Sequence, residues 1–223
     1  MKPWELLGEA CTPDGKQMRL TARDGEFVIL IDGKTLMSSR LHGSEEALAT
    51  AACRHVSARQ QPQVLVGGLG MGFTLRATLN LLPAEATVFV AELMVAVVDW
   101  NHGPLAPLAG HPLKDPRVSI LMEDVGDTLR AASDRFDAIL LDVDNGPSAF
   151  TSHENQELYD DDGVAAAHAA LRTGGGLAVW SAADDRSYER RLQAHGFDAS
   201  VERVRARPNK GGARHTIFLG LKP

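Results

Sequence analysis

The segment 64–76 constrains the fold of this chain more than any other stretch of the sequence. A β-branched run breaks there into Gly68, Gly70 and Gly72, spaced by two residues, and continues into a helix-forming stretch. This pattern turns a parallel strand sharply into a helix whose first N–H groups are free to bind a ligand. Side chains in the turn would block a nucleotide-like ligand. We therefore expect the turn, with Met71 included, to bind a nucleoside cofactor; a tight turn without a ligand is the alternative.

A carboxylate follows this turn at a fixed distance. Glu92 closes the apolar run 87–91, twenty residues after Gly72. At the end of a second strand it can accept hydrogen bonds from both hydroxyl groups of a ribose. The two features together predict a nucleoside site. The glycines lack the Gly-x-Gly-x-x-Gly order of dinucleotide binders, so the pattern favours an S-adenosyl cofactor over NAD.

Composition limits the class of protein. A chain of 223 residues, 44% hydrophobic and 23% charged, is typical of one soluble domain with a small appendage. The net charge of −6 argues against binding to nucleic acid. No apolar run is long enough for a membrane span, and no signal-peptide core is present. The two cysteines and the histidines show no disulfide or metal-ligand pattern. We expect a cytoplasmic protein without a metal.

The first forty residues differ from the rest of the chain. Three short strands are predicted at 17–22, 26–31 and 34–39, separated by two Asp-Gly dipeptides that favour tight hairpin turns. We expect an antiparallel meander in an N-terminal domain, 1–43, followed by a catalytic domain, 44–223. Three strands with many apolar residues need cover, so a homodimer is an expectation.

From residue 44 onward, helices and strands alternate. Ser44 is expected to cap the first helix, with Glu45 and Glu46 in its first turn. Further helices are predicted near 72–81, 94–101, 126–133, 158–171 and 185–194. Strands are predicted at 63–67, 87–92, 117–122, 136–142, 176–182, 197–204 and 214–221. This order predicts a Rossmann-like α/β fold with a seven-stranded, mostly parallel sheet and helices on both faces. Its last two strands form an antiparallel pair at one edge, as in class I methyltransferases.

Acidic residues follow the second, third and fourth of these strands. They are Glu92, then Glu123 and Asp124, then Asp142 and Asp144. Ligands in such sheets bind at the carboxyl ends of the strands, so we expect these carboxylates to converge on one cleft. Several acids in one cleft favour a cation such as a sulfonium or an amine.

The acids are expected to have different roles. Asp124 is predicted to lie near the exocyclic amine of an adenine, or, in the alternative, to cap the helix that follows. Asp142 is predicted to hold a cationic group, or to orient or deprotonate an incoming amine. Asp144 is a second catalytic candidate, in an Asp-Asn-Gly run that is also typical of a turn.

The glycine-rich segment 68–76, with its Thr-Leu-Arg ending, resembles that of spermidine synthases, the polyamine aminopropyltransferases. The resemblance spans roughly residues 17 to 182. It continues through Asp115-Pro116-Arg117-Val118, Glu123-Asp124, the strand 136–142, Gly146-Pro147, Phe150-Thr151-Ser152 and the segment 171–176. The resemblance implies an S-adenosyl-type cofactor, with Glu92 on the ribose, Asp124 near the adenine and Asp142 at the reacting centre.

The sequence departs from this family at three places. Met71 stands where the family has an acid in the glycine loop, which helps hold the aminopropyl amine. The Asp-x-x-Asp-Pro pattern that begins at Asp142 is shortened. The Tyr-His-Glu run of the polyamine pocket appears as Ser44-Glu45-Glu46, in which only the final acid has a counterpart.

These departures bear on the donor. Decarboxylated S-adenosylmethionine ends in a bare amine, whereas S-adenosylmethionine also carries a carboxylate, which an acid in the glycine loop would repel. Because Met71 removes that repulsion, the sequence favours S-adenosylmethionine and methyl transfer to an amine or another small nucleophile. Aminopropyl transfer from the decarboxylated donor is the alternative, and a non-catalytic nucleoside-binding module is a third. The basic stretch 203–214 is expected to be a solvated loop or, in the alternative, a flexible cover over the site.

Overall fold

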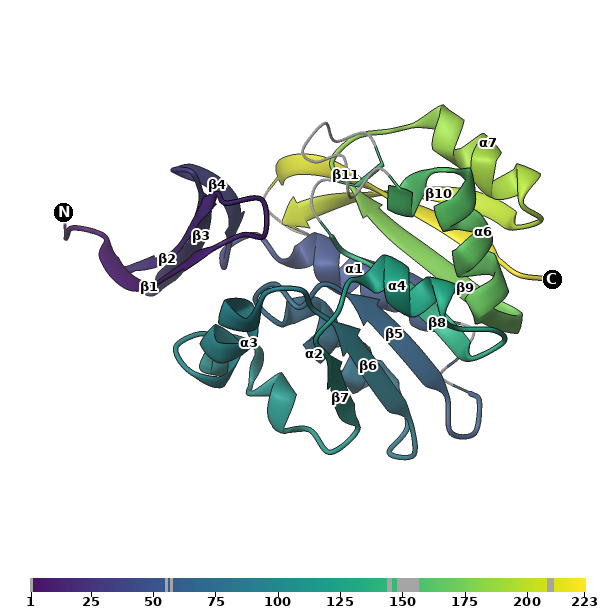
Figure 1. The fold of residues 1–223 in the computed structure, drawn as a ribbon, viewed down its shortest axis with the longest axis horizontal. Coiled ribbons are helices and arrows are strands. Elements are labelled where there is room, and N and C mark those ends of the chain that lie inside the picture. The colour runs from purple at the N-terminus through teal and green to yellow at the C-terminus, as the bar shows by residue number, and fades with distance from the viewer. Residues whose placement is uncertain (1, 55, 57, 144–145, 148–156, 208–210) are drawn as a thin grey trace.

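The computed structural model of the chain has two sheets (Figure 1). A four-stranded antiparallel sheet near the N-terminus lies beside a seven-stranded sheet that carries the helices. No helix in the described part of the chain is long and apolar enough to cross a membrane. The residues that the structure describes are 2–54, 56, 58–143, 146–147, 157–207 and 211–223.

The N-terminal sheet has its strands in sequence order, each antiparallel to the next. They are β1 (Glu5–Cys11), β2 (Gln17–Arg23), β3 (Glu26–Ile31) and β4 (Lys34–Ser38). The predicted meander is confirmed for β2 to β4, and Asp24 and Asp32 adopt left-handed φ angles of 49° and 48° in its tight turns. The sequence pattern does not predict β1, because Gly8 interrupts its apolar residues. The register with β2 also shifts between Leu6 and Gly8.

The seven-stranded sheet confirms the predicted fold. Its strand order is β10-β11-β9-β8-β5-β6-β7, with β5 to β9 parallel and β11 antiparallel to both β9 and β10. The strands are β5 (Gln63–Gly67), β6 (Thr87–Ala91), β7 (Val118–Leu121), β8 (Phe136–Leu141), β9 (Leu171–Ser181), β10 (Asp198–Arg207) and β11 (Gly211–Leu221). This is the class I methyltransferase-like topology, including the antiparallel edge pair.

Helices cover both faces of this sheet (Figure 1). Val64 and Val66 of β5 pack with the helices of one face, whereas Leu65 between them packs with those of the other. The first face carries α1 (Gly43–Cys53), α2 (Phe73–Leu81) and α3 (Val95–His102). The second carries α4 (Val125–Arg130), α6 (Asp161–Ala170) and α7 (Arg186–Ala194). Two short 3₁₀ turns, Ala106–Ala109 and Pro112–Lys114, follow α3.

The N-terminal sheet shares the core of the first face. Met18, Leu20 and Ile29 are buried in the same apolar cluster as the side chains of α1, α2 and α3. β1 approaches α3 closely, because a Cβ atom at Gly8 would lie only 2.4 Å from Nε1 of Trp100. A residue without a side chain is therefore needed at this contact, which holds the meander against the larger sheet.

Three local predictions are wrong. The stretch 203–214, expected to be a loop, belongs to β10 as far as Arg207 and to β11 from Gly211 onward. Ser44 does not cap α1: His42 occupies the cap position, and Ser44 is buried in the first turn, where its hydroxyl donates to Glu45 at 2.8 Å. β9 begins at Leu171, earlier than the predicted start at residue 176. Gly174, with a φ of 71°, lets the strand bulge at this point.

A buried ion cluster fixes the amino ends of the central strands. The Asp137 carboxylate, 2% exposed, accepts hydrogen bonds from Arg59 at 2.7 Å and from Arg172 at 2.9 Å. It also accepts from the backbone N–H of Gln63 at 2.7 Å. One carboxylate therefore ties together the start of β5, β8, β9 and the loop that precedes β5.

We expect Asp137→Ala to lower the free energy of unfolding by about 3 kcal/mol, because it leaves a buried amide and two arginines without their acceptor. The control, Asp127→Ala, removes an exposed pair with Arg130 and should change the free energy by less than about 0.5 kcal/mol. Urea unfolding followed by circular dichroism measures both variants. Equal unfolding midpoints for the two would contradict this role of Asp137.

Candidate functional site

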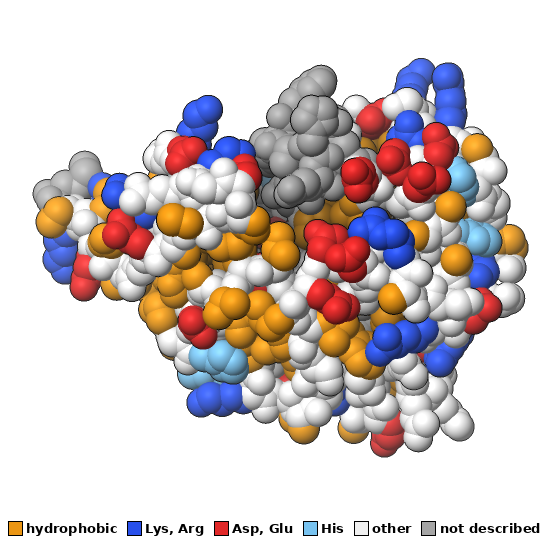
Figure 2. Space-filling view, in the orientation of Figure 1, with side chains coloured by type: hydrophobic (Ala, Val, Ile, Leu, Met, Phe, Trp, Pro, Cys, Tyr) orange, Lys and Arg blue, Asp and Glu red, His pale blue; other side chains and the backbone are white. Residues whose placement is uncertain are grey.

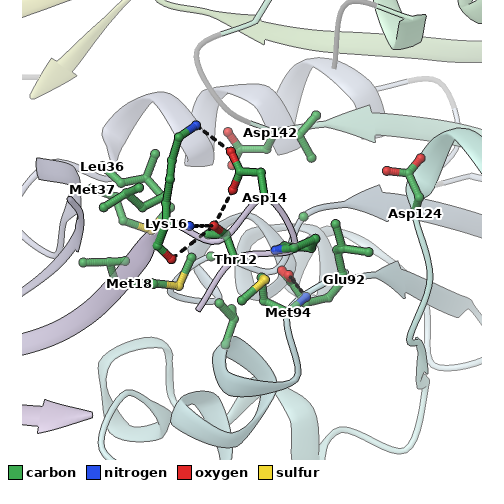
Figure 3. Close-up of a pocket in the computed structure, with 18 of the residues that line it drawn as sticks. Thr12, Asp14, Lys16, Met18, Leu36, Met37, Glu92, Met94, Asp124 and Asp142 are labelled. Atoms are coloured by element: carbon green, nitrogen blue, oxygen red, sulfur yellow. Dashed lines mark hydrogen bonds and ion pairs between the residues drawn. The ribbon is translucent and has the colours of Figure 1, made fainter. Parts of the chain in front are cut away.

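A cavity of about 610 Å³ lies between the N-terminal sheet and the carboxyl ends of β5, β6, β7 and β8 (Figure 3). One wall consists of residues from the β1–β2 turn and from β2, β3 and β4. The other wall consists of the loops that follow the four parallel strands. Six of the predicted site residues line it: Gly68, Gly70, Glu92, Glu123, Asp124 and Asp142. The structure thus brings together acids that the sequence placed at separate strand ends.

Three predicted site residues are not among the described residues that line the cavity. The Met71 side chain is 3% exposed and packs in the apolar core. Gly72, with a φ of 82°, precedes α2, where a Cβ atom would lie 3.0 Å from Asn101 Oδ1 and from Pro112 Cγ. Neither residue is among those that line the cavity. Asp144, the second catalytic candidate, lies outside the described residues.

The glycine turn is held in place from two sides. At Gly68, with a φ of 83°, a Cβ atom would lie 2.9 Å from the carbonyl oxygen of Asp142. At Gly70, with a φ of 51°, it would lie 3.2 Å from Cε of Met37 in β4. The Asn101 side-chain amide donates to the Gly70 carbonyl at 2.8 Å. The turn therefore contacts the end of β8 at Gly68 and the N-terminal sheet at Gly70.

Glu92 is oriented by the backbone on both sides of it. Its Oε2 accepts from the N–H of Leu69 at 2.9 Å, and its Oε1 accepts from the N–H of Met94 at 2.8 Å. Burial raises the pKa of this carboxyl group, while the backbone N–H groups act in the opposite direction. A carboxylate has about four lone-pair sites, so two amide bonds leave capacity for the two hydroxyl groups of a ribose.

Glu123 and Asp124 line the cavity and also accept hydrogen bonds from α4. Asp124 Oδ1 accepts from the N–H of Gly126 at 2.7 Å and caps α4, as the alternative interpretation of the sequence predicts. Glu123 Oε1 accepts from the Thr128 hydroxyl at 2.7 Å. Both acids are therefore held in fixed positions beside the end of β7.

Asp142 is fixed by groups from two neighbouring elements. Its N–H donates to the carbonyl of Gly67 at 3.0 Å, and its Oδ2 accepts from the hydroxyl of Thr74 at 2.5 Å. Thr74 lies in the first turn of α2 and is buried. Burial raises the pKa of Asp142, and the bond from Thr74 lowers it.

Three further charged residues belong to this region but are absent from the set predicted as the site. Asp14 and Lys16 of the β1–β2 turn form an ion pair at 2.6 Å and line the cavity, on the side of Asp142 (Figure 3). The Glu45 carboxyl group of α1 interacts electrostatically with that of Asp142. Of these three residues, the sequence points only to Glu45, because the run 44–46 occupies the position of the Tyr-His-Glu run of spermidine synthases.

The cavity wall is predominantly acidic. Among the described residues that line it, six are acidic and two, Lys16 and Lys34, are basic. Figure 2 shows acidic side chains near the middle of this face, beside hydrophobic side chains that extend toward the N-terminal sheet. Since Lys16 is already paired with Asp14, the wall favours a cationic ligand.

Comparisons with known proteins find polyamine aminopropyltransferases among the proteins that are similar in sequence. No family model matches the chain. Polyamine aminopropyltransferases 1 and 2 of Ralstonia nicotianae are each 33% identical to it over 138 residues. These matches cover 61% of this chain and 26% of each relative, so the matched region spans about a quarter of the relatives' length.

Solved spermidine synthases share the fold. A spermidine synthase in complex with the transition-state analogue AdoDATO has a TM-score of 0.75 at 18% identity, and the one from Thermotoga maritima has 0.76 at 17%. Each comparison covers 98% of this chain and 72% of the other. A probable spermidine synthase from Corynebacterium glutamicum has a TM-score of 0.67 at 17% identity, covering 100% of this chain and 81% of the other.

The resemblance predicted from the sequence is therefore confirmed: the chain is similar in sequence to two polyamine aminopropyltransferases, and it shares the class I methyltransferase-like fold of the solved spermidine synthases. The preference for methyl transfer is not supported, because the two curated relatives are named aminopropyltransferases. The comparisons favour the alternative that the sequence left open.

We expect Glu92→Ala to weaken the binding of methylthioadenosine about tenfold or more, because it removes the carboxylate oriented toward the cavity. Methylthioadenosine contains the ribose and adenine without a charged tail, so it tests the nucleoside contact alone. Isothermal titration calorimetry measures the affinity. Glu85→Ala, at an exposed acid in the loop before β6, is the control, and equal binding by both variants would remove Glu92 from the ribose contact.

Proposed function

We propose that this protein is a spermidine-synthase-like transferase, which moves an aminopropyl group from decarboxylated S-adenosylmethionine to an amine acceptor. The observation that carries the proposal is the acidic cavity between the glycine turn and the N-terminal sheet. Its wall combines a nucleoside-binding arrangement with carboxylates suited to cationic amines. The names of the two sequence relatives support the same reaction class.

The charges at the site favour the decarboxylated donor. The two donors differ by one carboxylate, and the sequence argument for S-adenosylmethionine rested on Met71 replacing an acid. The Met71 side chain is buried in the core, whereas six acidic residues, Asp142 among them, line the cavity. A donor carboxylate beside them would be repelled, and a donor ammonium would be attracted.

The remaining contacts follow from the geometry of the wall. Glu92 accepts hydrogen bonds from the ribose hydroxyl groups, and the backbone at Gly68 and Gly70 leaves room for the nucleoside. Asp124 lies on the adenine side, with Leu93 as an apolar neighbour on the same wall. When bound, the donor supplies a sulfonium-activated carbon and a neutral thioether as the leaving group.

Asp142 orients the acceptor and takes up its proton. An ammonium ion has no free lone pair, so the acceptor nitrogen must lose a proton before it can attack carbon. The Thr74 hydroxyl holds one Asp142 oxygen at 2.5 Å, which leaves the other oxygen for the acceptor. The protein contributes mainly positioning and electrostatic stabilisation in this mechanism.

Ligand-induced stabilisation separates the candidate donors. A ligand at about a hundred times its dissociation constant stabilises a protein by roughly 2.7 kcal/mol, which raises the melting temperature by several degrees at this chain length. We expect a larger shift with decarboxylated S-adenosylmethionine than with an equal excess of S-adenosylmethionine. Methylthioadenosine serves as the uncharged control. A larger shift with S-adenosylmethionine would favour methyl transfer, and no shift with any ligand would overturn the proposal.

We expect Asp142→Asn to reduce turnover about 100-fold or more, the scale of general-base catalysis, while the affinity for the donor stays within about tenfold. Methylthioadenosine release from the decarboxylated donor in the presence of linear diamines measures turnover. Asp32→Asn is the control: Asp32 also lines the cavity, but on the N-terminal sheet. Wild-type turnover in Asp142→Asn would remove Asp142 from the chemistry, and an inactive wild type that binds donor would favour a non-catalytic module.

A further inference from the structure

Asn101 is a buried amide in the last turn of α3, beside the glycine turn rather than on the cavity wall. It is 1% exposed, and it is not among the residues that line the cavity. Asparagine stabilises the interior of a helix less than alanine or leucine does, and burial of its amide costs free energy unless the amide is hydrogen-bonded. Neither helix formation nor apolar packing therefore explains an asparagine at this position.

The hydrogen bonds of the Asn101 amide do explain it. Its Nδ2 donates to the carbonyl of Val97 at 2.9 Å, within α3, and to the carbonyl of Gly70 at 2.8 Å, in the glycine turn. Its Oδ1 has no donor in the described part of the chain. An amide NH2 group has two hydrogen atoms to donate, so the donor capacity of this side chain is used in full while its acceptor is not. The opposite orientation would place Oδ1 against two carbonyl oxygens.

The glycine turn needs a restraint of this kind, because its glycines make it flexible as well as open. Gly70 lines the cavity and has a φ of 51°. Glycine changes its backbone conformation at little steric cost, so the peptide group that follows Gly70 is free to rotate unless something holds it. A hydrogen bond from the N–H of Gly72 to the carbonyl of Leu69 at 2.8 Å closes the turn. The bond from Asn101 directs the Gly70 carbonyl toward α3.

Asn101 also completes a ring of contacts around Glu92. The Glu92 carboxylate accepts from the N–H of Leu69 at 2.9 Å and from that of Met94, the residue before α3, at 2.8 Å (Figure 3). The start of α3 is thus bound to Glu92, and its last turn is bound through Asn101 to Gly70, which follows Leu69. A displacement of the glycine turn from α3 would therefore also displace a group that orients Glu92.

We propose that Asn101 is a positioning residue for the donor, whose amide holds the glycine turn in the conformation that accommodates the nucleoside and keeps the Leu69 N–H on Glu92. This inference rests on the proposed function, since it assigns the turn to the donor. Asn101 acts through Gly70 and Leu69 and touches no reacting atom. Because the turn is already ordered before the donor arrives, binding does not have to order it, and the effect of Asn101 appears in donor affinity.

The test is the binding of methylthioadenosine by Asn101→Ser, measured by isothermal titration calorimetry. A serine hydroxyl in a helix can still donate to the carbonyl four residues earlier, here that of Val97, but it is too short to reach Gly70. We expect the affinity to fall about tenfold, because the Gly70 carbonyl loses its donor and the turn its restraint. An affinity equal to that of the wild type would overturn the proposal.

Thr216→Val is the matched control. Thr216 of β11 is 3% exposed, and its hydroxyl donates to Asp184 at 2.5 Å. Neither Thr216 nor Asp184 lines the cavity. The control therefore also removes a buried hydrogen bond and lowers the stability of the protein, but it should bind methylthioadenosine like the wild type. An equal loss of affinity in both variants would contradict a specific role of Asn101.

Steady-state kinetics separate positioning from a general loss of structure. For Asn101→Ser we expect the KM for decarboxylated S-adenosylmethionine to rise about tenfold, with kcat within about threefold of the wild type, because a lost binding contact raises KM without changing the chemical step. A lower kcat at an unchanged KM would overturn the proposal.

A measurement on the wild type applies even if Asn101→Ser does not fold. Hydrogen exchange followed by NMR should show slow exchange of the Asn101 side-chain amide protons, since both are held by carbonyls. Asn80, an exposed asparagine in the last turn of α2, is the internal reference. Exchange at Asn101 as fast as at Asn80 would overturn the proposal.

The binding and transfer assays together distinguish this inference from the proposed function. Weaker binding of methylthioadenosine by Asn101→Ser, in a protein whose wild type transfers no aminopropyl group, would support the role of Asn101 and contradict the proposed function. Unchanged binding in a protein that does transfer the group would overturn the role of Asn101 alone.

Discussion

The site depends on how closely the first strand–helix turn approaches the end of β8. The Asp142 N–H reaches the carbonyl of Gly67 at 3.0 Å, and a side chain at Gly68 would collide with the Asp142 carbonyl oxygen. Because the two strand ends meet without a side chain between them, Thr74 at the start of α2 can donate to the Asp142 carboxylate. The same contact therefore shapes the glycine turn and orients the Asp142 carboxylate on the cavity wall.

The N-terminal sheet provides the second wall, so the cavity exists only because this sheet is held in place. Its apolar face enters the core of the main domain, and β1 packs on Trp100 at a position where only glycine fits. Met37 of β4 reaches the glycine turn at Gly70. A meander that would be marginal by itself thus gains stability from the larger domain and supplies Asp14 and Lys16 to the site.

The acidic residues that line the cavity change the conclusion about the donor that Met71 by itself suggests. From the sequence, Met71 removes an acid and favours a donor that carries a carboxylate. In the structure the Met71 side chain belongs to the core, and the acids that line the cavity include Glu92, Asp124 and Asp142. A missing charge at one position is informative only when the neighbouring charges are known.

The sequence by itself determined the α/β topology, the glycine turn and the strand-end acids Glu92, Asp124 and Asp142. These features follow from local periodicity, and parallel strands place their carboxyl ends at one edge of a sheet. Tertiary structure alone decided that β1 exists, that Met71 is buried and that the N-terminal sheet forms one wall of the cavity. Asp14 and Asp142 are distant in the chain and line one cavity only because the N-terminal sheet packs against the larger domain, a long-range arrangement that no local pattern encodes.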